Sequence, residues 1–340
     1  MIFRMTMQKT PLEISKRIKD VYLRYLDTAF WLRDKGLSKE RAKLVSEDGV
    51  LTTPPILEVG LPYLSTDSIA NVAKKIGLSE KVADSLSRCI FDSDGTFKLR
   101  KHQAEALQKT FEYGHSGGHN PIVTSGTGSG KTESFLLPLF ARLFQESERW
   151  STPKPLNQWW NQTAGEWHDS RFGDGSKLPA VRSIILYPTN ALVEDQISRL
   201  RKIVFKANKI SGTSPQFFFG RYTGATLGDQ TQPSKLNDAN IKEVAHEVRE
   251  IIDEFHELEN GNVGEEVLLQ SQNPLLGEMI TRWDMVASPP DILVTNFSML
   301  NVMLMRDVEK NIFESTKRWL AQDKNNVFTL VVDELHGYRG

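Results

Sequence analysis

Apolar residues recur at helical spacing through the first 95 residues of the chain. Between residues 11 and 45 they alternate with charged residues and indicate a pair of amphipathic helices: Ile14, Ile18, Val21, Tyr22, Tyr25, Leu26, Phe30 and Leu32. Prolines interrupt this pattern at Pro54, Pro55 and Pro62. A second helical stretch then follows, with apolar positions at Ile69, Val72, Ala73, Ile76, Val82 and Leu86. We therefore predict a small helical domain over residues 1–95.

The second helical stretch resembles a helix-turn-helix. Within Ser68–Ala83, Ala73 and Gly77 stand where a tight turn between two helices requires small residues. Helix pairs with a glycine turn also occur in proteins that never touch DNA, and only two lysines lie near this turn. We favour the plain helix pair, with DNA reading as the alternative.

From about residue 97 the pattern changes to short, continuous apolar runs that alternate with helical segments. The runs are Ile122-Val123, Ser183 to Tyr187, Phe217 to Phe219, Asp291 to Thr295 and Val327 to Val332. Continuous apolar runs are typical of strands that are covered on both faces. We predict the α/β class, with a doubly wound, mainly parallel sheet in a domain over residues 96–340.

Two stretches exceed what such a sheet needs, and we interpret them as insertions at about residues 146–180 and 226–290. The first is polar and carries four tryptophans, Trp150, Trp159, Trp160 and Trp167. The second contains an acidic helix with one apolar stripe, formed by Ile241, Val244, Val248, Ile251, Ile252 and Phe255. Tryptophans can stack on nucleic-acid bases, but packing is the favoured role for most of them because a long insertion must bury something to stay ordered. The acidic helix would repel DNA, so we expect it to pack on the core or on a partner.

Composition and charge limit the functions that the chain could have. The 340 residues are 39% hydrophobic and 25% charged, with a net charge of −1, so nucleic acid could be bound only through local patches or backbone amides. The single cysteine, Cys89, excludes an internal disulfide and a cysteine zinc cluster. We find neither a membrane-spanning apolar stretch nor a signal-peptide core, and the cytoplasm is the default location.

The run from Pro121 to Thr132 is typical of a phosphate-binding loop. Its three glycines let backbone amides approach an anion, and a helix that begins near Lys131 directs its unpaired amides there. Lys131 would reach the β and γ phosphates of ATP, and Thr132 would ligate Mg²⁺. A Gly/Ser linker is the alternative. The predicted nucleotide-binding residues here are Ser125, which replaces the usual first glycine, and Gly126, Thr127, Gly128, Ser129, Gly130, Lys131 and Thr132.

An apolar strand that ends in two carboxylates and an imidazole follows much later in the chain. Asp333 would hold Mg²⁺ in its outer shell, Glu334 would orient and deprotonate the attacking water, and His336 would sense the nucleotide. Acidic pairs at strand ends are common. The order, a phosphate loop first and this strand later, makes nucleotide hydrolysis the favoured interpretation.

With these two motifs in place, the sequence resembles the superfamily 2 helicases, which have a RecA-like fold. The resemblance implies that Arg100 and Gln103, in Leu-Arg-Lys-His-Gln, recognise adenine. It further implies that three elements grip the backbone of single-stranded nucleic acid without reading its sequence. Their predicted contact residues are Pro188, Thr189, Asn190, Thr223, Gly224, Thr295 and Asn296, with Asn190 in place of the family's common arginine.

Over about residues 95 to 340 the closer resemblance is to the bacterial MrfA-type, YprA-like helicases, which are related to RecQ. It is carried by Arg-Lys-His-Gln, Thr-Asn-Phe-Ser-Met-Leu and Asp-Glu-Leu-His-Gly-Tyr-Arg-Gly. It implies a DNA substrate, movement from 3′ to 5′, and a role in DNA repair or phage defence.

The sequence ends at Gly340, before the family's Ser-Ala-Thr strand and second RecA-like domain. We therefore expect an incomplete sheet and an N-terminal part of a longer helicase, inactive alone, whose second domain lies in the same chain or, as the alternative, in a separate one. Two other function classes stay open. One is a phosphate-loop ATPase that does no work on nucleic acid, and the other is a non-catalytic module that binds nucleotide or DNA.

Overall fold

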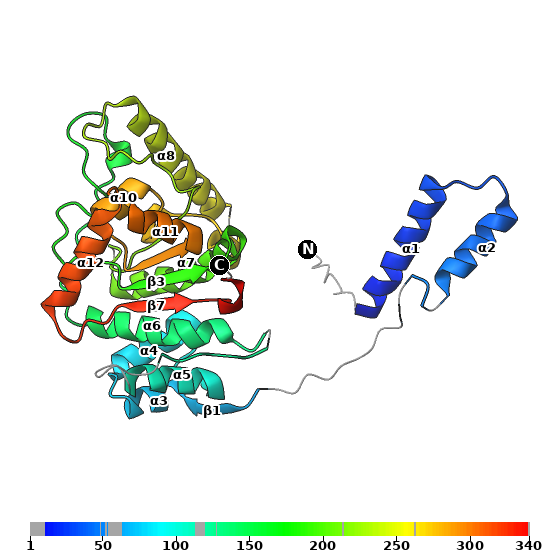
Figure 1. Ribbon diagram of the computed structural model, residues 1–340, viewed down its shortest axis with the longest axis horizontal. Coiled ribbons are helices and arrows are strands. Elements are labelled where there is room, and N and C mark those ends of the chain that lie inside the picture. The colour runs from blue at the N-terminus through cyan, green and yellow to red at the C-terminus, as the bar shows by residue number, and fades with distance from the viewer. Residues whose placement is uncertain are drawn as a thin grey trace. The chain divides into compact units, whose positions relative to one another are not determined.

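The computed structural model describes residues 11–338 except 48, 52, 54–62, 113–119, 127, 213 and 262. These residues form two compact units, 1–62 and 63–340. In the first unit, α1 (Pro11–Ala29) and α2 (Lys35–Ser46) form a helix pair, as predicted (Figure 1). Asp34 caps α2 by accepting from the Gly36 amide, and Arg41 pairs with Asp27 of α1 at 2.6 Å. No residue of α2 is buried.

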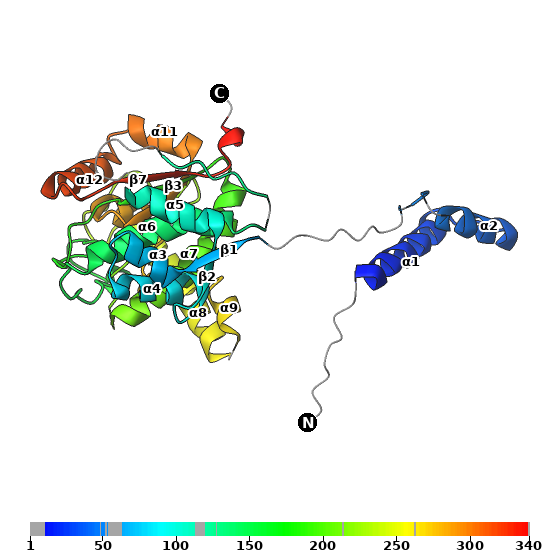
Figure 2. The same cartoon turned by 90° about the horizontal axis from the view of Figure 1, so that it is seen from below.

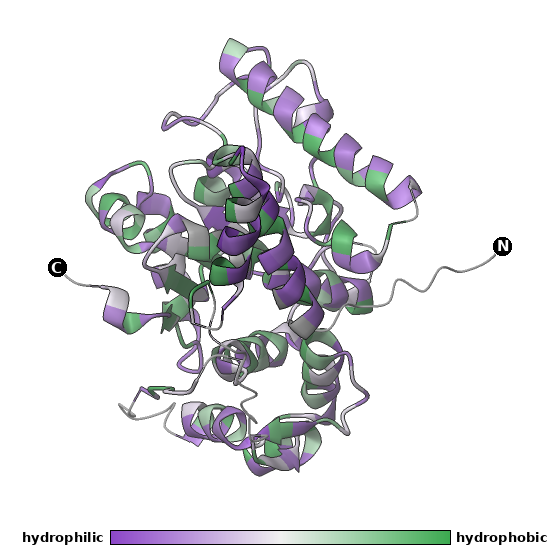
Figure 3. Cartoon of the chain, turned by 90° about the vertical axis from the view of Figure 1, so that its right-hand side faces the viewer, coloured by the Kyte–Doolittle hydropathy of each residue, from purple (hydrophilic) through white to green (hydrophobic). Residues whose placement is uncertain are grey.

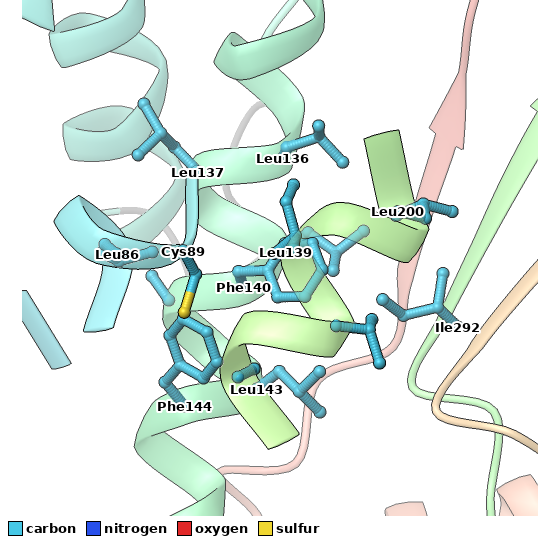
Figure 4. Packing of buried hydrophobic residues seen from close by; sticks show 14 of the residues in the cluster. Leu86, Cys89, Leu136, Leu137, Leu139, Phe140, Leu143, Phe144, Leu200 and Ile292 are labelled. Carbon is cyan, nitrogen blue, oxygen red and sulfur yellow. The ribbon is translucent and has the colours of Figure 1, made fainter. Parts of the chain in front are cut away.

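The second unit begins with a helical layer. The strands β1 (Ser65–Ser68) and β2 (Lys98–Arg100) pair antiparallel and flank α3 (Ile69–Lys75) and α4 (Glu80–Phe91), and α5 (Lys101–Glu112) and α6 (Lys131–Ser147) follow. The helices α3 and α4 share one core with the sheet, so the unit boundary lies at residue 62, whereas we expected one near residue 95. Figure 4 shows this shared core around Cys89 of α4 and Phe140 and Phe144 of α6. Cys89 is buried in this core, and burial raises the pKa of its thiol to about 12.

A five-stranded parallel sheet forms the centre of the second unit, with strand order β5-β4-β6-β3-β7. Its strands are β3 (Ser183–Tyr187), β4 (Phe219–Tyr222), β5 (Glu278–Met279), β6 (Ile292–Asn296) and β7 (Thr329–Val332). The helices that follow are α7 (Asn190–Ser211), α8 (Ala239–Asn260), α9 (Glu265–Leu268), α10 (Arg282–Ala287), α11 (Phe297–Met305) and α12 (Lys310–Gln322). The described residues also form three short 3₁₀ helices, η1 (Trp159–Asn161), η2 (Pro274–Leu276) and η3 (Leu335–Gly337).

Helices cover both faces of this sheet, which confirms the doubly wound, RecA-like α/β prediction. Ile185 of β3 and Val294 of β6 point to the core that α3, α4, α6 and α7 share. Their neighbours Ile184 and Leu293 point to the opposite core, which α10, α11 and α12 cover. The two helical layers lie on either side of the strands in Figure 1. This double coverage is why the strands read as continuous apolar runs.

Two predicted strands differ from the observed ones. The strand expected at Phe217 begins only at Phe219, because side chains already bind the two preceding amides: Asn208 accepts from Phe217 N at 2.8 Å and Asp291 from Phe218 N at 2.8 Å. Ile122-Val123 forms no strand, and Ile122 is 79% exposed.

β7 is the outermost strand on one side of the sheet. Within the described residues β7 pairs only with β3, and its Leu330 is 52% exposed. A cavity of about 510 Å³ lies between α6 and the amino ends of β3 and β7. A strand forms where a neighbouring edge accepts its amides, and within the described residues no strand pairs with residues 120–126.

The two stretches that we interpreted as insertions pack against each other. Trp159, Trp160 and Trp167 from the first share a buried core with Trp283 and the apolar stripe of α8 from the second. Packing, the favoured role for the tryptophans, is thus confirmed for these three. The predicted stripe of α8 is buried except at Ile251, which is half-buried, and hydrophilic and hydrophobic residues alternate along this helix at the top of Figure 3.

Candidate functional site

The segment before α6 has the backbone of an anion-binding loop. Gly128 and Gly130 have φ angles of 72° and 76°, in the left-handed region that other residues avoid. A Cβ atom on Gly130 would lie 2.4 Å from the Gln103 Nε2 atom, so this position also requires glycine for space. Gly130 is the N-cap of α6 and offers no side-chain cap, which leaves the first amides of the helix available for an anion.

The two residues expected to recognise adenine lie directly against this loop. Arg100 donates from Nη1 to the Gly128 carbonyl at 2.9 Å, and Gln103 donates from Nε2 to the Gly130 carbonyl at 3.1 Å. Gln103 is buried, and its Oε1 accepts from the Arg100 amide at 3.0 Å. In this structure both side chains hold the loop backbone, so adenine contact stays a prediction for them.

Two serines of the loop are hydrogen-bonded to each other, and a tyrosine lies against Arg100 and Gly126. Ser129 is buried and donates to the Ser125 hydroxyl at 2.6 Å. The ring of Tyr63 lies 5.0 Å from the Arg100 guanidinium carbon, and its hydroxyl would be 3.2 Å from a Cβ atom on Gly126. No motif marks Tyr63 in the sequence. Thr127 is outside the described residues.

The loop lysine and the distant carboxylate pair meet at one edge of the sheet. Lys131 Nζ lies 3.9 Å from Glu334 Oε1, and the two side chains are 37% and 36% exposed. Thr132, half-buried, follows at the start of the same helix. The two motifs, far apart in the sequence, therefore lie next to each other in the fold.

Local electrostatics distinguish the two carboxylates. Burial raises the pKa of Asp333, and the charge of Glu334 adds to this, while the bond from the Glu334 amide to Asp333 Oδ1 and the charge of Lys131 oppose it. Glu334 has φ 48°, a left-handed backbone that costs about 1–3 kcal/mol in a residue other than glycine and is characteristic of functional sites. His336 is 78% exposed and places Nδ1 3.2 Å from Glu334 Oε2.

The residues present fit a magnesium-bound triphosphate. The glycine-lined backbone and Lys131 are suited to phosphate oxygens, and Gly128 has open space where a side chain would stand. Mg²⁺ in such sites is bound by one or two protein oxygens together with phosphates and water. The Thr132 hydroxyl and the Asp333 carboxylate are oxygen donors of this kind. Within the described residues no group of three or more acidic, histidine or cysteine side chains is placed to hold a metal.

Two of the predicted strand-gripping elements meet at the same edge. Because β3 and β6 are parallel neighbours with Tyr187 opposite Asn296, the segments after them lie side by side. Asn296 donates from Nδ2 to Asn190 Oδ1 at 2.6 Å. Pro188 is half-buried, Thr189 and Asn190 are exposed, and Thr189 is the N-cap of α7 without a side-chain cap bond.

The third element is the turn after β4, and its Thr223 points inward. Thr223 is buried and accepts from the Ala225 amide at 3.3 Å. Thr295, in the neighbouring strand β6, is also fully buried and donates to the Tyr222 carbonyl at 2.7 Å. Gly224, the next residue after Thr223, is exposed. The threonine hydroxyls therefore stabilise the turn in this structure, and the exposed surface of the element is Gly224.

The short helix η3 and Tyr338 directly after it contact two of the three strand-gripping elements. A Cβ atom on Gly337 would be 3.2 Å from Pro188 Cβ, so the chain passes close to the first element. The ring of Tyr338 meets Phe297 edge to face, with centroids 5.7 Å apart. Figure 2 shows this red turn near α11. Phe297 and Tyr338 were missed as candidates, although both lie inside motifs that the sequence marks.

Comparison with known proteins agrees with this geometry. The profile of the DEAD/DEAH box helicase family matches residues 100–273, which include the phosphate loop and end before Asp333. The Druantia protein DruE of Escherichia coli (strain UMEA 4076-1) is 30% identical over 376 aligned positions that cover 96% of this chain. The chain spans 18% of the length of that relative. In the part of the chain that the structure describes, no helix has both the length and the apolar character that crossing a bilayer requires.

Proposed function

Because the chain belongs to the DEAD/DEAH box helicase family, we propose that it is the ATP-binding part of a DNA helicase or translocase. The family has helicase-type ATPases that act on nucleic acid. The finer proposal, a DNA substrate held as a single strand, is supported by the resemblance to the MrfA-type group and by the strand-gripping elements. The same resemblance supports a role in DNA repair or phage defence.

The observation that carries the proposal is the meeting of Lys131 and Glu334. A cation on a glycine-lined helix start and carboxylates at a strand end lie within 3.9 Å of each other. Phosphoryl transfer needs little more from a protein than positioning and charge around the transferred group. A sheet edge of this kind supplies both.

In the proposed site each residue has one task. Lys131 and the amides of residues 126–131 bind the triphosphate, and Thr132 and Asp333 hold Mg²⁺, which would neutralise phosphate charge. Glu334 orients the attacking water and accepts its proton, and His336, in contact with Glu334, senses the nucleotide.

The nucleic-acid strand is proposed to lie over the exposed groups of the same edge. Thr189, Asn190, Gly224 and Asn296 would contact phosphates, and such contacts position a strand without reading its sequence. Thr223 and Thr295 would act by holding the Gly224 turn. Since the chain spans 18% of its relative, we also propose that a second RecA-like domain of the same polypeptide completes the ATP site.

Nucleotide binding tests the proposal directly. We expect this chain to bind a fluorescent ATP analogue with Mg²⁺, Lys131→Ala to weaken binding at least about tenfold, and Glu334→Gln to retain it. Lys317→Ala is the control, because Lys317 is exposed and pairs only within α12. Unchanged ATP binding by Lys131→Ala would refute the site. ATP binding without any affinity for single-stranded DNA would favour the phosphate-loop ATPase that does no work on nucleic acid.

A further inference from the structure

The turn after β4 exposes two small residues above a buried support. Gly224 and Ala225 are exposed, whereas Thr223 and Thr226 on either side are buried. The turn is closed by its own bonds: the Thr223 amide donates to Thr226 Oγ1 at 2.8 Å, and Thr226 Oγ1 donates to the Arg221 carbonyl at 2.8 Å. These bonds fix the two buried ends and leave the tip open.

Arg282, the first residue of α10, supports this turn from a distant part of the sequence. Its Nη2 donates to the Thr223 carbonyl at 3.1 Å, and its guanidinium carbon lies 5.3 Å from the centre of the Tyr222 ring. The Arg282 amide donates to the Leu227 carbonyl at 2.8 Å, which joins the start of α10 to the chain directly after the turn. Residues 226–290, interpreted as an insertion, thus contact through Arg282 the strand-gripping turn that precedes them in the sequence.

The charge of Arg282 has no acidic partner in the described part of the chain. The residue is 8% exposed, its Nε atom has no hydrogen-bond partner, and none of the ion pairs there includes it. The carboxylate of Glu309, which accepts from the Tyr222 hydroxyl at 2.7 Å, is already bound by Arg306. A buried, unpaired guanidinium is costly, and its field reaches further through protein than through water.

We propose that Arg282 is a positioning residue of a phosphodiester subsite at Gly224 and Ala225, where it holds the Thr223 carbonyl and supplies positive charge beneath the turn. A nucleic-acid phosphate on the exposed side of the turn is the counter-charge that the described residues do not supply. The inference rests on the proposed function, because it names the support of one strand-gripping element. It also gives residues 226–290 a task, which is to deliver this guanidinium.

The test measures binding of a fluorescein-labelled oligothymidylate to this chain by anisotropy at several salt concentrations. Arg282→Met should weaken binding about tenfold and lower the slope of log affinity against log salt by about 0.7, the value for one phosphate on a single strand. Arg282→Lys keeps the charge and loses the planar fork, so we expect the wild-type slope with about threefold weaker binding. Affinity for the ATP analogue should be unchanged in both variants.

Arg201→Met is the matched control. Arg201 is also nearly buried and also anchors residues 226–290, through Glu278 at 2.7 Å and the Gln270 carbonyl at 2.6 Å, but it does not contact the turn. It should keep wild-type DNA affinity and salt slope, with thermal unfolding measured for every variant.

Each outcome decides between the claims. A wild-type chain that binds no oligothymidylate overturns the proposed function and this inference with it. A wild-type chain that binds, with Arg282→Met binding equally well, overturns the inference alone. An equal loss in Arg201→Met overturns it too, because the effect would then come from the stability of residues 226–290. If Arg282→Met does not fold, Arg282→Lys with wild-type affinity overturns it.

Discussion

Two lysine–carboxylate pairs lie at opposite ends of the sheet and differ in how deeply they are buried. Lys131 and Glu334, at the carboxyl end of β7, are more than a third exposed and stand 3.9 Å apart. Lys177 and Asp291, at the amino end of β6, are 1% and 0% exposed and in direct contact. The same residue types therefore form an accessible ion pair in one place and a buried ion pair in the other.

The buried pair is saturated with partners. Asp291 also accepts from Arg182 at 3.0 Å and from the Phe218 amide at 2.8 Å, and Lys177 lies 3.9 Å from the centre of the Trp150 ring. Burial would raise the pKa of Asp291, but the charges of Lys177 and Arg182 outweigh it and hold the pKa below its ordinary value. The open pair lacks such a shell, so its charges remain available for a ligand. The number of partners around each pair, more than the residue types in it, distinguishes the buried pair from the exposed one.

The largest expected effect tests this difference by removing one carboxylate from each pair. Asp291→Ala leaves buried cations without a counter-charge and should lower the free energy of unfolding by about 3–5 kcal/mol. Glu334→Ala removes a half-exposed partner and should change it by less than about 1 kcal/mol. Urea unfolding of both variants measures this. Similar losses in the two would contradict the comparison.

A smaller effect concerns a third buried carboxylate, Asp284, in the tryptophan-rich core. It accepts from the Ser170 amide at 2.7 Å and from the hydroxyl of Thr281 at 2.6 Å, yet burial outweighs these bonds and raises its pKa to about 6. A raised carboxyl pKa means that the folded state binds the proton more tightly, so stability from this group is lost as the pH rises from about 4 to about 6.

Asp284→Asn removes this titration. Between pH 4 and pH 6 the wild type should lose about 2–3 kcal/mol relative to the variant, as measured by urea unfolding at both pH values. A stability difference that stays constant across this range would show that the core does not hold Asp284 as the structure indicates.

The smallest effect is expected at the open site. Gly130→Ala forces a side chain into a left-handed backbone and against Gln103, and should cost about 1–2 kcal/mol. It should also weaken ATP binding, because the loop must shift. Gly175→Ala, where the backbone is ordinary and the space open, should stay within about 0.5 kcal/mol of wild type in thermal unfolding. Equal stability of the two variants would argue that the loop is not tightly held.

Much of the centre of the molecule was predictable. The apolar run Ser183 to Tyr187 became β3 residue for residue, because a fully covered strand leaves a continuous pattern. The closeness of Lys131 and Glu334 agrees with the nucleotide-hydrolysis interpretation that the order of the two motifs favoured. The absence of a strand at Ile122-Val123 was not predictable in the same way, because strand pairing depends on a neighbouring strand that no local pattern reveals.

The sequence by itself determined the sheet class, the phosphate loop and the family, because periodicity and glycine-lysine chemistry act over a few adjacent residues. Only the tertiary structure decided which charged side chains are exposed and which are buried. It also decided that Trp159 and Trp283 share one core and that Arg282 lies beneath Gly224. Burial and partner saturation are properties of neighbours brought together from distant positions. A residue's own identity cannot specify them.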